Sequence, residues 1–289
     1  MAMTLSGRPK VTTIRVVTFN TLFGGHDDFG LGAGDRWRGQ IEFLKGLEAD
    51  ILALQECNFW DLLGCRRMYQ TLNALELGSA YLAHANETTS GHRFHSVIML
   101  SPRVRLTAQG ADRDRYHHVM GWANLILPGL EGLLELRNLH LDPFDPRNRA
   151  REISPLGVLA APGRRSLVVG DANTIGLDYP EPDWRRLPAH AVNGHLGLPR
   201  EGEDQVSDRD ATELLARAGF KDASHPFQQE TVPTAAFGTG DVPRRQDLIL
   251  MSPTLAPALV NYQVHLEPVD KELSDHGAVS ADFDLSRVA

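Results

Sequence analysis

The chain has 289 residues, of which 42% are hydrophobic and 23% charged, a composition typical of a folded globular protein with a sizeable core. Its formal net charge of -8 argues against broad electrostatic adhesion to polyanions, which draws on clustered Lys and Arg. An acidic active site stays compatible with this charge, because carboxylates gathered around a cation contribute to it. Cys57 and Cys65 are too few for a disulfide framework and are expected to be reduced thiols.

The amino-terminal residues carry no export signal, because they lack an apolar stretch of about 7 to 15 residues. No later run approaches the roughly 18 apolar residues of a membrane span. We therefore expect a cytoplasmic protein without a membrane span, with removal of a leader before the first residue as the open alternative. No obligate protein partner is evident in the sequence.

Short apolar runs recur along the chain, and several are bounded by Gly, Pro, Asn or Asp, which favours strands. The runs cover residues 14–19, 51–54, 96–100, 123–127, 133–139, 167–169, 247–251 and 278–283. Helical spacing of apolar residues predicts a helix over 35–47. Further helices are expected over 60–77 and 208–218, the latter ended by Gly219.

The order of these elements predicts an α+β fold. Strands without intervening helices dominate residues 80–140, which is unlike a regular alternation of strands and helices. We expect a four-layer α/β sandwich, in which two mostly antiparallel β-sheets pack face to face and are flanked by helices. Residues 1–289 are interpreted as a single catalytic domain with a core of about 14–284, and 176–207 as a long surface excursion.

Polar clusters follow or open the apolar runs, where a sheet holds side chains rigidly and adjacent loops leave room for a ligand. The candidates are Asn20, Glu56, His140, Asp171, Asn173, Asp247, Asp275 and His276. Each has an ordinary explanation when taken alone, as a turn former, a solvated strand end or a satisfied core histidine. Those explanations do not account for the shared position of the candidates at strand ends.

The order of the motifs carries a resemblance. Asn20 follows the first strand, Gln55-Glu56 the second, and His140-Leu141 a middle strand, and the series ends with Gly170-Asp171-Ala172-Asn173 and Ser274-Asp275-His276. Together they resemble the endonuclease/exonuclease/phosphatase superfamily, with its deoxyribonuclease I-like fold, over about residues 14–284. The resemblance implies a divalent-metal-dependent phosphoesterase that hydrolyses phosphodiester bonds without a covalent intermediate.

Phosphoester hydrolysis calls for a hard cation with oxygen ligands, which Mg²⁺ supplies and Mn²⁺ also suits. Glu56 is the expected direct ligand and Asp275 a second contact, directly or through water. Asn20 is expected to hold this region and to reach the metal through water. These three residues form the predicted metal site.

The resemblance assigns the remaining residues to catalysis. Asp171 is expected to position or deprotonate the attacking water, and Asn173 to contact the phosphate or that water. His276, held by Asp247, is a general base or an imidazolium that stabilises charge. His140 is a phosphate ligand or a general acid, and the identity of the basic histidine stays open.

The transfer from the family is limited by departures from its usual motifs. Ala172 stands where the family often has an aromatic residue, and Leu248 follows Asp247 where a polar or aromatic neighbour is usual. Secondary substrate contacts are expected from His95, Arg147, Arg149 and Arg245. Of the adjacent His117 and His118, at most one is expected to reach the site, because side chains alternate along a strand.

The leading hypothesis for function is a nuclease that acts on DNA or RNA. The alternative is a phosphatase or phosphodiesterase of a small phosphorylated metabolite, nucleotide or lipid headgroup, which the acidic composition favours. A non-catalytic binding domain with the same fold is the third hypothesis, although the polar positions that catalysis needs are all filled.

Overall fold

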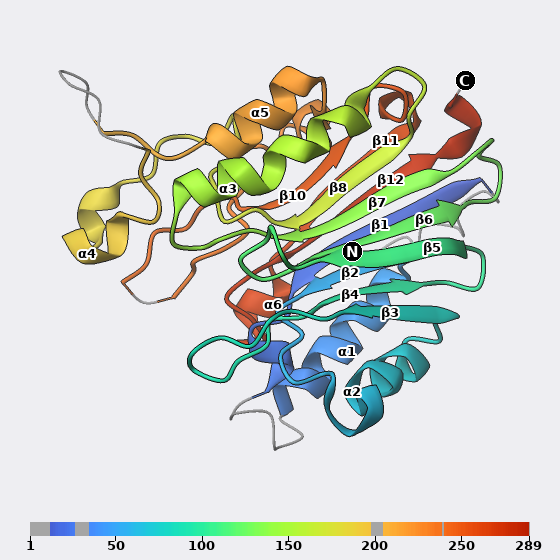
Figure 1. The fold of residues 1–289 in the computed structure, drawn as a ribbon, viewed down its shortest axis with the longest axis horizontal. Coiled ribbons are helices and arrows are strands. Elements are labelled where there is room, and N and C mark those ends of the chain that lie inside the picture. The colour runs from blue at the N-terminus through green and yellow to red at the C-terminus, as the bar shows by residue number, and fades with distance from the viewer. Residues whose placement is uncertain (1–11, 27–34, 198–204, 239, 289) are drawn as a thin grey trace, which may run out of the picture.

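The computed structural model describes residues 12–26, 35–197, 205–238 and 240–288. Two six-stranded sheets stack face to face (Figure 1). The first sheet has the order β11 (Leu259–His265), β12 (Ala278–Asp284), β1 (Thr13–Asn20), β2 (Ile51–Gln55), β4 (Ser96–Leu100), β3 (Ser79–Ala83). The second has the order β5 (Arg105–Asp112), β6 (Met120–Ile126), β7 (Leu134–His140), β8 (Ser166–Asp171), β10 (Asp247–Met251), β9 (Lys221–Asp222).

Helices cover the outer faces of both sheets. Figure 1 shows α1 (Asp35–Leu47) and α2 (Leu62–Ala74) outside the first sheet, and α3 (Pro146–Ile153) and α5 (Asp210–Ala218) outside the second. Two short helices, α4 (Ala189–Val192) and α6 (Glu267–Asp270), lie in connections. The predicted α+β four-layer sandwich is confirmed. No helix within the described residues is long and apolar enough to cross a membrane.

Side-chain alternation along the strands divides the core into layers. On β1, Val16 faces the layer between the sheets, whereas Val17 faces the helices outside. The layer between the sheets joins apolar residues of both, among them Val16, Ala53, Ile98, Leu136, Val169 and Ile249. The outer faces are closed by Phe43 of α1 on one side and Leu215 of α5 on the other.

Strand pairing places the polar strand ends together. β1 pairs with β2 and β7 with β8 in parallel, while the other pairs in both sheets are antiparallel. The register sets Asn20 beside Gln55 and His140 beside Asp171, and the antiparallel β10 sets Asp247 beside Asp171. The carboxyl ends of two parallel pairs therefore meet at one end of the sandwich.

Most predicted elements are found, with differences at their ends. α1 has the predicted bounds of 35–47, and α5 ends before Gly219, whose φ is +113°. α2 is shorter than the predicted 60–77, and Leu63, Gly64 and Cys65 in its first turn have positive φ. The excursion 176–207 includes α4, and its residues 198–204 lie outside the described part of the chain.

Candidate active site

The layer between the sheets changes from apolar to polar toward the end where the strand termini meet. Thr18, Gln55 and Asn138 occupy inward positions there and are fully buried. Nε2 of Gln55 donates to Oδ1 of Asn138 at 2.6 Å, and Nδ2 of Asn138 donates to the carbonyl oxygens of Leu54 and Val97 at 3.0 Å. Because buried polar groups need partners, these bonds tie the two sheets together beneath the site.

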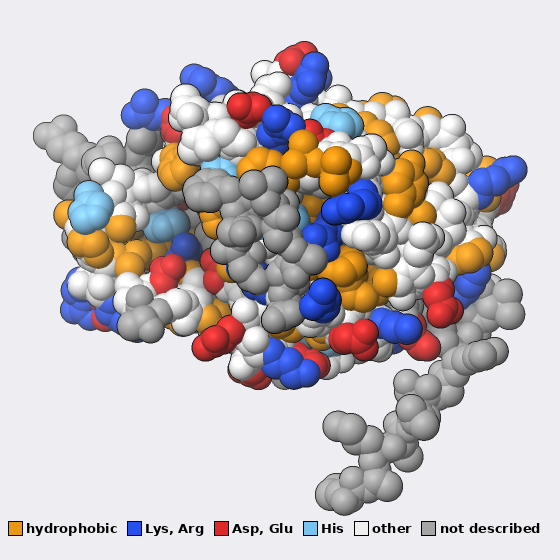
Figure 2. All heavy atoms as spheres, turned by 90° about the horizontal axis from the view of Figure 1, so that it is seen from below, with side chains coloured by type: hydrophobic (Ala, Val, Ile, Leu, Met, Phe, Trp, Pro, Cys, Tyr) orange, Lys and Arg blue, Asp and Glu red, His pale blue; other side chains and the backbone are white. Residues whose placement is uncertain are grey.

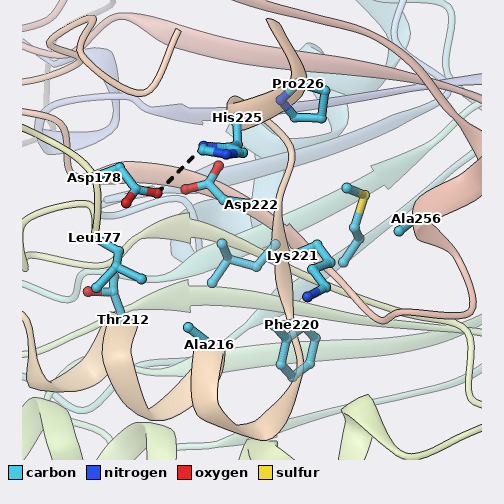
Figure 3. A pocket seen from close by; sticks show the side chains of 12 residues that line it. Leu177, Asp178, Thr212, Ala216, Phe220, Lys221, Asp222, His225, Pro226 and Ala256 are labelled. Carbon is cyan, nitrogen blue, oxygen red and sulfur yellow. Dashed lines mark ion pairs between the residues drawn. The ribbon is translucent and has the colours of Figure 1, made fainter. Parts of the chain in front are cut away.

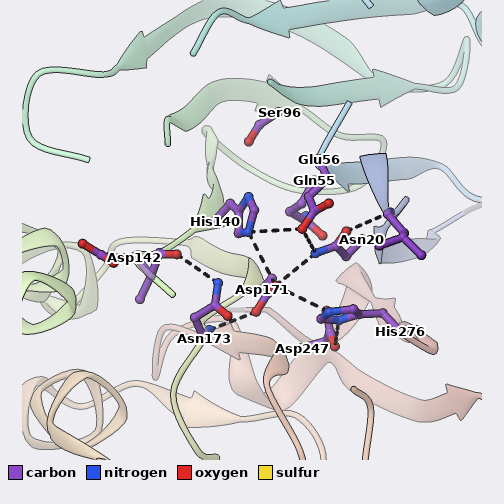
Figure 4. A network of polar contacts seen from close by, with 12 residues as sticks. Asn20, Gln55, Glu56, Ser96, His140, Asp142, Asp171, Asn173, Asp247 and His276 are labelled. Atoms are coloured by element: carbon purple, nitrogen blue, oxygen red, sulfur yellow. Dashed lines mark hydrogen bonds and ion pairs between the residues drawn. The ribbon is translucent and has the colours of Figure 1, made fainter. Parts of the chain in front are cut away.

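Asn20 holds two carboxylates together (Figure 4). Its Nδ2 donates to Oε1 of Glu56 at 3.2 Å and to Oδ2 of Asp171 at 3.0 Å. Its Oδ1 accepts a hydrogen bond from the backbone N–H of Leu22 at 3.0 Å, which fixes the orientation of the amide. These bonds give Asn20 a positioning role, and its expected water-mediated contact with a metal stays a prediction.

Glu56 sits just past β2 in the left-handed region, with a φ of +54°. Its Oε2 accepts from the backbone N–H of Phe23 at 2.9 Å, and burial raises the pKa of its carboxyl group. Asp171 and Asp275 line the same cavity as Glu56. The carboxylate oxygens of these three residues are of the kind that a hard divalent cation prefers.

His276 is fixed by Asp247. Its Nδ1 lies 2.9 Å from Oδ2 of Asp247, a fully buried residue whose backbone N–H donates to Oγ1 of Thr234. Burial alone lowers the pKa of His276, but the charges of Asp247 and Asp171 outweigh burial and raise it above its ordinary value. The protonated form of His276, a donor with a positive charge, is therefore favoured.

His140 has the opposite character. Its Nε2 lies 3.8 Å from Oε1 of Glu56 and 3.7 Å from Oδ2 of Asp171. Burial, followed by the charge of His276, lowers the pKa of His140 to about 3, so its ring is neutral. The site thus pairs one charged and one neutral imidazole around Asp171.

The end of β8 shapes the loop that carries Asp171 and Asn173. Gly170 has a φ of +127°, and an added Cβ would collide with the carbonyl oxygen of Leu139, so only glycine fits. The N–H of Asn173 donates to Oδ1 of Asp171 at 2.9 Å, and its Nδ2 donates to the carbonyl oxygen of Leu141 at 3.0 Å. Both oxygens of Asp171 are therefore oriented by hydrogen bonds, one from Asn20 and one from Asn173.

A cavity of about 810 Å³ opens over these groups. Glu56, His140, Asp171, Asn173, Asp275 and His276 line it. An aromatic wall, which we define as Phe23, Phe94, His118 and Phe144, lines the same cavity. Within this wall Phe94 contacts Phe23 and His118, with ring centroids 5.6 and 5.0 Å apart. The seven predicted catalytic and metal-site residues other than Asn20 thus lie in this cavity or, for Asp247, directly behind it.

Both His117 and His118 line the cavity, so the expectation that at most one of them reaches the site is wrong. The two residues precede β6, which begins at Met120, and strand alternation does not apply to them. The ring of His118 stacks on that of His140, with centroids 4.1 Å apart. No motif in the sequence marks the aromatic wall. Only Phe144 could have been suspected, because it follows the candidate residue His140 closely in the sequence.

His95 does not line the cavity, contrary to its expected substrate contact. It is 1% exposed, its Nδ1 accepts from the backbone N–H of Ala85 at 2.9 Å, and its Nε2 lies 3.1 Å from Oδ1 of Asp61. Potential metal-ligand atoms of Asp61, His84 and His95 lie within 4.8 Å of one another. Since Nδ1 of His95 accepts a hydrogen bond, Nε2 carries the proton and faces Asp61 as a donor. The pair is better explained as a buried contact between the ring and the carboxylate.

Two of the three expected substrate arginines are buried and ion-paired. Arg149 is fully buried, and its Nη2 lies 2.8 Å from Oδ2 of Asp208. Arg245 is also fully buried, with its Nη2 2.6 Å from Oδ2 of Asp222. Neither lines the cavity, so their predicted contacts with substrate are corrected to structural ion pairs. Arg147 is exposed on α3 and likewise lies outside the cavity lining.

A second cavity of about 330 Å³ lies beside α5 and β9, and it contains none of the predicted site residues (Figure 3). His225 and Asp178 form an exposed ion pair at its edge, with Nδ1 of His225 3.7 Å from Oδ2 of Asp178. The rest of its lining is largely apolar.

Solved structures with the same architecture are readily found. An endonuclease/exonuclease/phosphatase family protein from Leptotrichia buccalis is 13% identical, with a TM-score of 0.61 over 93% of this chain and 99% of that one. The fold is that of the endonuclease/exonuclease/phosphatase proteins. A protein of the same family from Beutenbergia cavernae is 15% identical, with a TM-score of 0.64 over 94% of this chain and 71% of that one.

The endonuclease/exonuclease/phosphatase fold also occurs in truncated Caenorhabditis elegans TDP2, which is 18% identical with a TM-score of 0.61 over 94% of this chain and 97% of that one. No protein-family model and no curated protein sequence matches this chain. The fold expected from the order of the motifs is confirmed, and it places the polar cluster at one end of the sandwich.

Proposed function

We propose that this protein is a divalent-metal-dependent phosphoesterase that hydrolyses phosphodiester bonds at the end of the sandwich. One observation carries the proposal. Glu56, Asp171 and Asp275 face the same cavity as a charged His276 and a neutral His140. This combination offers a cation site, an acceptor for a water proton and a positive charge for phosphoryl oxygens within one cleft.

Glu56 and Asp275 are the residues that would hold Mg²⁺ or Mn²⁺. The fit rests on the chemistry of the donors, because repulsion from Asp275 adds to burial in raising the pKa of Glu56, and a cation relieves both. When bound, the metal supplies neutralisation of charge on the phosphoryl oxygens. Asn20 holds the carboxylates of Glu56 and Asp171 close to each other, because its amide nitrogen donates to both.

Asp171 is the proposed acceptor for the proton of the attacking water. Its two oxygens are oriented by Asn20 and Asn173, and its Oδ2 lies 3.8 Å from Nε2 of His276. His276, protonated through Asp247, then stabilises the charge that develops on the phosphoryl group. The low pKa of His140 makes it a neutral hydrogen-bonding partner of the phosphate rather than the general acid.

A nucleic acid is the leading substrate. A solved Danio rerio TDP2, 15% identical to this chain with a TM-score of 0.59, is complexed with a single-strand DNA product. The aromatic wall beside the cluster suits stacking of nucleobases, which depends on flat rings and not on base sequence. A single strand or a strand end fits this cavity better than an intact duplex, whose bases are already stacked.

A small phosphodiester is the second candidate, favoured by the charge of the cavity. Its described lining has five acidic side chains and one arginine, Arg244, which is engaged by Asp241 at 2.9 Å. Figure 2 shows Lys and Arg side chains scattered among acidic and apolar ones on one face of the molecule, without a basic stripe. Binding to a long polyanion draws on such stripes.

The test compares substrates under identical conditions. Bis(4-nitrophenyl) phosphate, a single-stranded oligonucleotide, plasmid DNA and 4-nitrophenyl phosphate are incubated with Mg²⁺ and either the wild type or His276→Ala. We expect hydrolysis of the aryl diester and the oligonucleotide by the wild type and its loss in the variant. A preference for the monoester would overturn the diesterase assignment. Equal binding of all substrates without turnover would favour a non-catalytic domain. The cytoplasmic location expected from the sequence stays a prediction.

A further inference from the structure

A second histidine–aspartate pair lies on the cavity wall, separate from His276 and Asp247. Nδ1 of His117 lies 3.3 Å from Oδ2 of Asp142. The His117 side chain is 33% exposed, whereas that of Asp142 is 7% exposed. His117 lines the cavity over the active site, and Asp142 lies behind it. The exposed member of the pair is therefore the one that faces the space for substrate.

Hydrogen bonds from the surrounding loops and α3 hold the pair in place. Asp142 accepts hydrogen bonds from the backbone N–H of Phe144 at 2.7 Å and from Nδ2 of Asn148 at 2.8 Å. The fully buried Glu152 of α3 accepts from the backbone N–H of His117 at 2.6 Å and from that of Asp142 at 3.0 Å. One carboxyl group thus fixes the backbones of both members, which come from opposite sides of the β6–β7 hairpin.

The direction of the ring follows from this framework. Because Nδ1 faces Asp142, Nε2 lies on the other side of the imidazole, and no hydrogen bond to it occurs within the described residues. The ring of His117 makes edge contacts with His118 and Phe144, with centroids 4.6 and 5.6 Å apart. His118 in turn stacks on His140 beside Asp171. His117 is therefore two ring contacts away from the catalytic cluster.

The charge of the ring fits an anionic partner. The hydrogen bond to Asp142 raises the pKa of His117 above its ordinary value, so the protonated donor form is favoured. Arg244, the one arginine in the described lining, is engaged by Asp241. His117 thus provides a cation beside the aromatic wall, and its Nε2 is still available as a donor.

We propose that His117, held by Asp142, donates from Nε2 to a second anionic group of the substrate, the phosphate next to the one that is hydrolysed. The inference rests on the proposed phosphodiesterase function and adds a specificity-determining residue to it. His117 would favour a diester with a neighbouring phosphate over the same diester without one. The reacting groups around Asp171 would be unaffected by its loss.

The test measures affinity and turnover separately. Affinities of the dinucleotide d(TpT), and of the same dinucleotide with an added 5′- or 3′-terminal phosphate, are measured by calorimetry in EDTA. Turnover of all three is then measured with Mg²⁺. We expect the wild type to bind one phosphorylated form about tenfold more tightly than d(TpT), the size of a hydrogen bond to a charged group. His117→Asn and Asp142→Asn should abolish that preference and leave the affinity for d(TpT) unchanged.

Two controls separate this role from a structural one. His117→Arg restores a cation and should recover the preference, whereas His225→Asn removes a histidine of a similar pair in the second cavity and should retain it (Figure 3). A wild type without preference, or a preference that survives in His117→Asn, would overturn the inference. Absence of hydrolysis with Mg²⁺ in all proteins would instead refute the proposed function, while the binding data still decide the role of His117.

Discussion

At the residue scale, the charge states of two histidines divide their tasks. The charges of Asp247 and Asp171 raise the pKa of His276, whereas burial and the charge of His276 lower the pKa of His140. The sequence left open which histidine is the base. The directions of their pKa shifts favour a third group for that task, because the charges beside His276 raise its pKa and burial lowers that of His140. The acceptor proposed above is Asp171.

This division predicts the effect of Asp247→Asn. The amide cannot balance the charge of His276, so the pKa of His276 should fall and the positive charge near the phosphoryl group should be lost at neutral pH. We expect kcat for an aryl phosphodiester to drop by about a hundredfold or more, as for His276→Ala. Steady-state kinetics with His225→Asn as the control would check this. Wild-type kcat in Asp247→Asn would contradict it.

Residue identity was predictable where a motif marked it, and burial was not. Asn20 and Glu56 were found because they follow strand-length apolar runs, and His276 because it closely precedes one, all in a characteristic order. Arg149 and Arg245 were misassigned because arginines near a site are exposed by default. Their partners, Asp208 and Asp222, lie 59 and 23 residues away, and no local pattern announces such pairs.

At the scale of elements, Arg149 links α3 to the segment that precedes α5. Its guanidinium contacts Asp208 and donates to the carbonyl oxygens of Asp142 and Gly194 at 2.9 and 2.7 Å. Asp208 in turn accepts from Oγ1 of Thr174 at 3.2 Å. The ends of the long excursion are thereby fastened to the helix beside the active site.

Loss of this linkage should destabilise the protein. Arg149→Met leaves the charge of Asp208 buried without its partner, so we expect the free energy of unfolding to fall by about 3 to 5 kcal/mol. The matched control is Arg217→Met, which removes an exposed pair with Glu213 and should change stability by less than about 1 kcal/mol. Urea unfolding of both variants would decide, and equal stabilities would refute the structural role of Arg149.

Helices with a clear apolar face were the most predictable elements, and edge strands the least. α1 has the expected bounds because Trp37, Ile41 and Leu44 recur at helical spacing. β5 and β11 were not predicted as apolar runs, because both lie at sheet edges and have partly exposed sequences. Their pairing with β6 and β12 depends on the neighbouring strands of the sheet and cannot be predicted from the hydrophobicity of the two segments alone.

At the scale of the whole molecule, partial burial of histidines lowers their pKa and links stability to pH. Burial lowers the pKa of His195 and of His265 to about 4, from an ordinary value of 6.5. Below pH 6.5 the unfolded chain therefore takes up protons before the folded protein does. The free energy of unfolding should accordingly decrease as the pH falls from about 6.5 to 4.

Replacing one of these histidines measures its contribution to the pH dependence of the free energy of unfolding. We expect His265→Gln to lose about 1 to 2 kcal/mol less stability than the wild type over this pH range. Urea unfolding at several pH values in EDTA measures the difference. The variant His225→Gln changes an exposed histidine and should follow the wild type. Parallel pH profiles for His265→Gln and the wild type would show that His265 is not a source of the acid sensitivity.

The two sheets meet at their polar ends around Glu56, and the central claim is that a divalent metal acts there on a phosphodiester. The most direct test is a Mg²⁺ titration of bis(4-nitrophenyl) phosphate hydrolysis by the wild type and Glu56→Gln, starting from EDTA-treated protein. We predict no activity in EDTA, recovery with Mg²⁺ or Mn²⁺, and at least about a tenfold higher Mg²⁺ requirement in the variant. Hydrolysis that resists EDTA, or an unchanged Mg²⁺ requirement in Glu56→Gln, would contradict the claim.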